Sequence, residues 1–129
     1  MSDLLSPRLD RVLVVAAHPD DEILGCGGTM TKLTRKGVAV RTVILGEGKT
    51  SRDEVRDPGK RADDIASLRD EIIAANSVVG VEDVHAMDFP DNRFDSVALL
   101  DIVKTVDAQI DAFRPSVVLT HFALDINVD

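Results

Sequence analysis

The sequence predicts an α/β fold of the Rossmann-like kind, in which a mostly parallel sheet carries helices on both faces and so forms three layers. Apolar runs of strand length alternate with longer stretches whose apolar residues recur every three or four positions, an alternation typical of parallel sheets with helical crossovers. The runs are rich in β-branched residues, as expected of strands that are buried on both faces. Because such crossovers are right-handed, the carboxyl ends of the strands should share one edge of the sheet.

The first half of the chain contains two predicted strands and one predicted helix. In order, the segments are a strand at 11–17, a helix at 23–36, a strand at 38–45 and a polar loop at 46–60. Gly37 follows the helix as its C-cap. We expect the polar loop to be mobile and to lie over the functional site.

The second half repeats the alternation. It contains a helix at 61–79, a short strand at 84–87, a helix that ends before Pro115 and a strand at 116–120. Asp95 or Ser96 is expected to cap the second of these helices. Its apolar stripe consists of Leu99, Val103, Val106, Ile110 and Phe113. No shift of composition divides the chain, so residues 1–129 are predicted to form one α/β domain.

A strongly polar segment follows directly on the first strand. His18-Pro19-Asp20-Asp21-Glu22 places an imidazole and three carboxylates at the sheet edge where open α/β folds bind ligands. His18 and Asp21 are close enough in sequence to hold one divalent ion together, while Pro19 holds the turn. Asp20 would then stand beside a water molecule as a candidate general base. With a third protein ligand, the segment indicates metal-assisted hydrolysis.

These residues, followed by Leu24-Gly25-Cys26-Gly27-Gly28-Thr29, resemble the opening motif of the PIG-L/LmbE-like zinc-dependent deacetylases. The resemblance extends over essentially the whole chain. It implies an enzyme that removes the acetyl group from an N-acetylglucosamine-type sugar or glycoconjugate and releases acetate and a free amine. It also implies Zn²⁺ as the cofactor on His18 and Asp21, with Asp20 as the base. The same nitrogen and oxygen ligands accept other divalent cations.

The last ten residues resemble the family segment that leads into an Asp-His pair, whose His is the third zinc ligand. The sequence stops at Asp129, so we expect it to be the N-terminal part of a longer deacetylase. A polypeptide that ends there is expected to bind zinc loosely and to hydrolyse its substrate slowly or not at all. Many members also carry a His that assists the oxyanion or the leaving group where this chain has Asn127, whose amide donates a hydrogen bond but delivers no proton.

Three further side chains are candidates for binding the substrate. Arg52 and Asp91 occupy loops which in the family commonly hold sugar hydroxyls, a task that suits an Arg fork and a carboxylate. A plain solvated loop is an equal alternative for each of them. His121 follows the fourth strand at the same edge, where it is a candidate for substrate contact or a substitute metal ligand.

Other interpretations stay open. The acidic run also fits a solvated turn whose carboxylates stabilise a helix N-terminus. A glycine-rich first loop suggests a nucleotide-binding Rossmann-like module, but the G-x-G-x-x-G spacing from Gly25 puts Met30 where the third glycine belongs. We expect Gly25, Gly27 and Gly28 to let the helix pack close to the sheet instead. The last alternative is a truncated, non-catalytic remnant that uses the fold for assembly.

Composition limits the classes of partner and the cellular location that we expect for this protein. A net charge of -8 argues against a nucleic acid or an anionic membrane surface as the main partner, and a small N-acetylated sugar or glycoconjugate is expected instead. A homo-oligomer is compatible with the sequence. No apolar run is long enough for a membrane span, and residues 1–10 lack the apolar core of a signal peptide. A single cysteine fits a reducing compartment, so a cytoplasmic location is expected.

Overall fold

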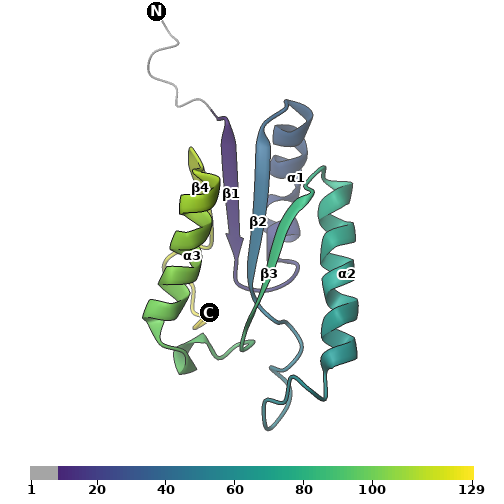
Figure 1. The fold of residues 1–129 in the computed structure, drawn as a ribbon, viewed down its shortest axis with the longest axis vertical. Coiled ribbons are helices and arrows are strands. Elements are labelled where there is room, and N and C mark those ends of the chain that lie inside the picture. Colours follow the sequence, from purple (N-terminus) through teal and green to yellow (C-terminus); the bar gives the residue numbers. More distant parts are fainter. Residues whose placement is uncertain (1–8) are drawn as a thin grey trace, which may run out of the picture.

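The strands of the described chain form a four-stranded sheet in the order β3-β2-β1-β4, and every neighbouring pair is parallel (Figure 1). The computed structural model describes residues 9–129. Its elements in chain order are β1 (Arg11–Ala16), α1 (Asp21–Arg35), β2 (Ala39–Gly46), α2 (Ala62–Val78), β3 (Asp83–Phe89), a 3₁₀ turn (Phe94–Ser96), α3 (Leu99–Phe113) and β4 (Val117–Leu119). Strands and helices therefore alternate as the sequence predicts.

The side chains of β1 alternate between two cores on opposite faces of the sheet. Leu13 and Val15 share one core with apolar residues of α3. Val12 and Val14 share the other with apolar residues of α1. α2 covers this second face beside α1, where Ile72 packs over the ends of β1 and β2. The arrangement confirms the predicted three-layer α/β fold with helices on both faces of a parallel sheet.

α1 begins at Asp21, two residues earlier than the predicted start. Asp21 and Glu22 consequently lie in its first turn, where the partial positive charge of a helix N-terminus stabilises carboxylates. The loop between β1 and α1 is therefore short, and the motif is divided between a loop and a helix. Its first carboxylate, Asp20, stays in the turn that precedes the helix.

Two predictions about α3 are wrong. Asp95 and Ser96 lie in the 3₁₀ turn, and α3 follows Ala98 without a side-chain cap. Leu99, expected in the buried stripe, is 75% exposed, whereas Ile102 packs on the core. α3 carries more apolar residues than one helix face can bury, so tertiary contact decides which of them are covered.

The glycines of α1 do not serve close packing. A Cβ atom at Gly25 or Gly28 would meet open space, and one at Gly27 would meet only a side chain of the same helix. The packing prediction for these three residues is therefore wrong, and their place inside a helix also rules them out as a phosphate-binding loop. A close approach does require Gly46, because a Cβ there would lie 2.8 Å from the carbonyl oxygen of Ala17.

The carboxyl ends of the strands meet at one edge of the sheet. Four segments leave this edge, namely 17–20, 47–61, 90–93 and 120–129. The N–H of Gly46 at the end of β2 donates to the carbonyl oxygen of Ala17 at 2.7 Å, which ties the first two segments together. Residues far apart in the sequence therefore come together here.

Two expectations concern membranes. Across residues 9–129, no helix has both the length and the apolar content to span a bilayer. The expectation about a signal peptide concerns residues 1–10, and all but the last two of these lie outside the described residues.

Replacing Leu13 by Ala tests the central position of β1. Its side chain is fully buried, so we expect Leu13→Ala to lower the free energy of unfolding by about 2–5 kcal/mol, through lost burial and the cavity left behind. Leu24→Ala is the matched control, since Leu24 lies largely exposed on α1 and its truncation should change stability by less than about 0.5 kcal/mol. Urea unfolding measures both, and equal losses would contradict the placement of β1 in the core.

Candidate active site

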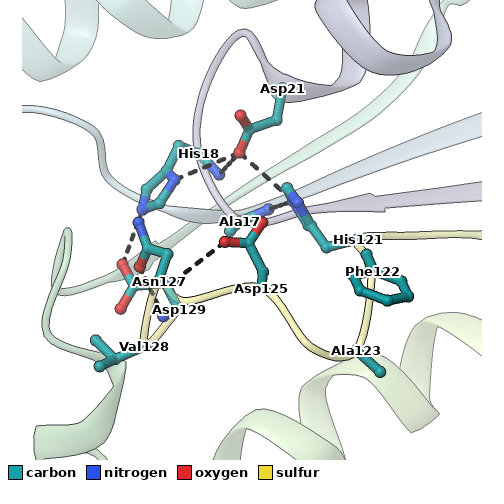
Figure 2. A pocket seen from close by; sticks show the side chains of 10 residues that line it. All are labelled: Ala17, His18, Asp21, His121, Phe122, Ala123, Asp125, Asn127, Val128 and Asp129. Carbon is teal, nitrogen blue, oxygen red and sulfur yellow. Dashed lines mark hydrogen bonds and ion pairs between the residues drawn. The ribbon is translucent and has the colours of Figure 1, made fainter.

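A cavity of about 450 Å³ opens at the carboxyl edge of β1 and β4. Figure 2 shows that its walls come from the loop after β1, the first residue of α1 and the segment after β4. The lining residues are Ala17, His18, Asp21, His121, Phe122, Ala123, Asp125, Asn127, Val128 and Asp129. The two predicted metal ligands thus lie in the same cavity as two of the other predicted site residues, His121 and Asn127.

The imidazole of His18 lies among three carboxylates. Its Nδ1 is 3.3 Å from Asp21 Oδ2, and on the other side of the ring Nε2 is 2.8 Å from Asp129 Oδ2 and 3.5 Å from Asp91 Oδ1. The side chains of Asp91 and Asp129 are only 6% and 0% exposed. In the described part of the chain, no Lys or Arg forms an ion pair with any of these carboxylates. Buried negative charge of this kind favours a bound cation.

The contacts of His18 indicate which ring nitrogen carries the proton. An ionised carboxylate only accepts hydrogen bonds, so the 2.8 Å contact with Asp129 places the proton on Nε2. In the neutral imidazole, the lone pair of Nδ1 is then free beside Asp21. Ligand atoms on a tetrahedral zinc ion lie roughly 3.3 Å apart, given zinc-ligand distances of about 2.0–2.1 Å. The 3.3 Å between Nδ1 and Asp21 Oδ2 fits a shared ion, whereas the 2.8 Å contact on the other side is a hydrogen bond.

The far side of the ring offers a second set of possible metal ligands. Ligand atoms of His18, Asp91 and Asp129 all lie within 4.8 Å of one another. Because the two sets share His18, an ion on the Asp21 side leaves Asp129 as the hydrogen-bond acceptor behind the ring, with Asp91 Oδ1 at 3.5 Å from the same nitrogen. Acceptors in that position orient a ligating imidazole and raise its basicity. Either set of imidazole and carboxylate donors fits a divalent metal ion.

Asp20 occupies a strained turn between β1 and α1. Its φ of 106° is in the left-handed region, which costs a non-glycine residue about 1–3 kcal/mol. The N–H of Asp20 donates to Glu22 Oε2 at 3.0 Å, and its carbonyl oxygen accepts the N–H of Leu24 at 2.9 Å. Asp20 is exposed and lines a neighbouring hollow with Leu68 of α2. The structure does not place Asp20 among the residues that line the cavity.

Glu22 lies on the inner side of the same turn. Only 2% of the residue is exposed. Burial raises the pKa of its carboxyl, and hydrogen bonds from its own N–H, the N–H of Asp20 and the side chain of Asn76 act in the opposite direction. Glu22 therefore supports the loop from behind without lining the cavity.

His121 lines the cavity from the segment after β4. Its Nε2 accepts the N–H of Ala17 at 2.9 Å, and a backbone N–H only donates, so this nitrogen is unprotonated. The same nitrogen is 3.4 Å from Asp21 Oδ2. Because its lone pair is already used, His121 does not offer Nε2 to an ion held by Asp21, which argues against its role as a substitute ligand. The proton on the other ring nitrogen is available to a ligand.

Asn127 and Asp129 form a turn that closes one side of the cavity. The Asn127 side-chain oxygen accepts the N–H of Asp129 at 2.9 Å, and its amide nitrogen donates to Asn92 Oδ1 at 3.0 Å. Asp129 Oδ1 accepts the N–H of Phe94 at 2.9 Å. Sequence reasoning gave Asp129 no role of its own, and the one signal for it was its place directly before the expected third ligand.

Arg52 and Asp91 have different surroundings. Asp91 is buried, and its carboxylate faces the imidazole at the site. Arg52 is exposed and lines a separate hollow within the 47–60 loop. An ion pair between Arg56 and Glu47, with a nitrogen-oxygen distance of 2.7 Å, holds this loop. Among the described residues the loop supplies none of the cavity lining, so the prediction that it lies over the site is wrong.

Comparison with known proteins places the chain in a family. The family model described as PIG-L, GlcNAc-PI de-N-acetylase, matches residues 13–129. The chain belongs to the PIG-L family. The match starts within β1 and includes every residue that lines the cavity, and it confirms the resemblance drawn from the polar motif.

Relatives of this PIG-L-family chain are named as sugar deacetylases. It is 32% identical to the 1D-myo-inositol 2-acetamido-2-deoxy-alpha-D-glucopyranoside deacetylase of Mycobacterium sp. (strain KMS), over 93% of the chain and 46% of that protein. It is 31% identical to the diacetylchitobiose deacetylase of Thermococcus kodakarensis, over 84% of the chain and 39% of that protein. The solved N,N'-diacetylchitobiose deacetylase from Pyrococcus horikoshii superposes with a TM-score of 0.72 at 26% identity, covering 90% of this chain and 43% of that one. The chain thus spans less than half the length of these relatives.

Opposite tautomers are expected for two histidines of this PIG-L-family chain. His85 Nε2 is 2.9 Å from Asp83 Oδ1, a carboxylate acceptor, so that nitrogen should be protonated. His121 Nε2 accepts from Ala17 and should be unprotonated. Nitrogen NMR shifts near neutral pH distinguish the two states, and a coupling across the hydrogen bond from Ala17 to His121 measures the contact directly. A protonated Nε2 in neutral His121 would contradict the geometry.

Proposed function

We propose that this protein is a metal-dependent N-deacetylase, which hydrolyses the acetamide group of an N-acetylglucosamine-type sugar or glycoconjugate to acetate and a free amine. The observation that carries the proposal is the His18 imidazole among three carboxylates beside an open cavity, without an ion-paired Lys or Arg in the described chain. Membership of the PIG-L family and the names of the relatives support the substrate class.

Zn²⁺ is the proposed cofactor, held by His18 Nδ1 and Asp21, with Asp129 and Asp91 orienting the imidazole from behind. His85 lies on β3 and His121 is engaged by Ala17, so the third ligand is proposed to come from outside the described residues. When bound, the cation supplies a Lewis acid that polarises the acetamide carbonyl and lowers the pKa of water toward about 7. Other divalent cations suit the same donors.

Protons are handled by Asp20 in the proposed reaction. Its carboxylate takes a proton from the attacking water, and the protonated carboxyl then delivers it to the departing amine, so that the proton count balances. Asn127 donates a hydrogen bond to the oxyanion that forms when water attacks the carbonyl carbon of the acetyl group. Both side chains must turn for this, because Asp20 lines the neighbouring hollow and the Asn127 amide is bound to Asn92.

Substrate contacts are proposed mainly for His121. It lines the cavity, and the proton on its second ring nitrogen can be donated to a sugar hydroxyl. Asp91 acts through His18, which it contacts, and Arg52 reaches a bound sugar only if the 47–60 loop moves toward the cavity. The partner is a small N-acetylated sugar or glycoconjugate, and the single cysteine supports a cytoplasmic location.

Loss of the imidazole at position 18 tests the metal centre. His18→Ala in the full-length protein should weaken zinc binding by at least roughly 100-fold, since removing even an outer partner of a ligand typically costs 10–100-fold. His85→Ala is the matched control, because His85 pairs with Asp83 on β3, outside the cavity. Elemental analysis and a zinc titration measure both variants. Equal zinc affinity in the His18 variant and the wild type would exclude the proposed ligand set.

Removing the proposed base tests the chemistry. Asp20→Asn in the full-length, metal-loaded protein should retain zinc and lower the turnover number by about 10²–10⁴-fold. Asp107→Asn, an exposed change on α3, is the control and should keep the wild-type rate. The measurement is acetate release from three substrates: N-acetylglucosamine, N,N'-diacetylchitobiose and 1D-myo-inositol 2-acetamido-2-deoxy-alpha-D-glucopyranoside. Wild-type turnover in the Asp20 variant would reject the base, and no release by the wild type from any of these substrates would favour a non-catalytic role.

A further inference from the structure

Glu22 and Asn76 form a buried polar pair that the reaction above does not use. Asn76 is 0% exposed on α2, and its Nδ2 donates to Glu22 Oε1 at 3.0 Å and to the carbonyl oxygen of Ile72 at 3.0 Å. The second oxygen of Glu22, Oε2, accepts the N–H of Asp20 at 3.0 Å. A continuous chain of hydrogen bonds therefore runs from α2 through α1 to the turn that carries Asp20.

We propose that Glu22 and Asn76 are positioning residues, which hold the backbone of Asp20 in its left-handed conformation and so fix the point from which its carboxylate turns toward the cavity. This inference rests on the proposed function, because it assumes that Asp20 is the base. Neither residue lines the cavity, so both act through Asp20 rather than on the substrate or the metal.

The burial of this polar pair is unfavourable for stability, which indicates that the pair has another role. Asn76 and Glu22 lie next to an apolar core that contains Ile72, where apolar side chains of similar volume would avoid the desolvation of a carboxylate and an amide. Among residues 9–129, the buried Oδ1 atom of Asn76 has no hydrogen-bond partner. The amide is also fixed in orientation, since both atoms that face its nitrogen are acceptors. The side-chain interaction that the Asn76 amide makes is therefore the hydrogen bond that its Nδ2 donates to Glu22.

The metal ligands are held by separate contacts. The backbone N–H of His18 donates to Asp21 Oδ2 at 2.9 Å, and the His18 ring is oriented by Asp129. Asp20 itself has a φ of 106° and depends on Glu22 for its N–H partner. Weakening the Glu22 contact should therefore release Asp20 while the ligands stay in place, so that turnover and metal affinity respond differently.

Two variants of Asn76 in the full-length protein test the proposal. Asn76→Ala removes the hydrogen bond and leaves a small cavity, and Asn76→Leu removes it while filling the space, which keeps the test valid if the first variant is unstable. Ser77→Ala is the matched control at the next, exposed position of α2. Amide hydrogen exchange of Asp20, zinc affinity, and separate turnover number and KM values with N,N'-diacetylchitobiose are measured for each. Glu22→Gln is expected to resemble the Asn76 variants, since its amide would place a donor against another donor.

In both Asn76 variants we expect several-fold faster exchange at Asp20, unchanged zinc affinity and KM, and a turnover number lower by about 10- to 100-fold, as for a misplaced catalytic group. Introduced together with Asp20→Asn, they should cause no further loss of turnover. Wild-type turnover in both variants, unchanged exchange at Asp20, or an equal loss in the Asp20→Asn background would each overturn the inference. Wild-type turnover of Asp20→Asn alone would instead reject the base, while hydrogen exchange would still report on the contact.

Discussion

The structure is organised around an excess of negative charge at one imidazole. Asp21 faces one nitrogen of His18, and Asp91 and Asp129 face the other. Carboxylates as buried as the last two are stable only with a compensating positive charge or a proton. No described Lys or Arg supplies that charge. A bound divalent cation therefore gives the most direct physical account of why these side chains lie together.

The parallel sheet brings about this concentration of charge. β1 lies between β2 and β4, so the loop that begins after it is bordered by segments from both neighbours. Gly46 allows that loop to approach β2, and the 121–129 segment after β4 closes the cavity on the other side. Apolar cores pack on both faces of the sheet behind this edge. The fold itself supports many chemistries, so the functional conclusion depends on the donors at this edge.

The short turn between β1 and α1 must direct neighbouring side chains to different places. His18 and Asp21 point toward each other, while Asp20 in between them lines a different hollow. A positive φ at Asp20 makes this separation possible. The conformation costs free energy, and so does the buried pair of Glu22 and Asn76 behind it. Strain and buried polarity at one turn are typical of sites where function competes with stability.

The sequence by itself determined the α/β class, the order of strands and helices, and the closeness of His18 to Asp21. These features depend on local patterns, namely the apolar periodicity and the separation of three residues between His18 and Asp21. Only the tertiary structure decided the rest of the site. The contact of His18 with Asp129 spans 111 residues and that of Glu22 with Asn76 spans 54, and such contacts depend on strand register and helix packing that no local pattern encodes. For the same reason packing placed the Arg52 loop away from the cavity and chose which apolar residues of α3 are buried.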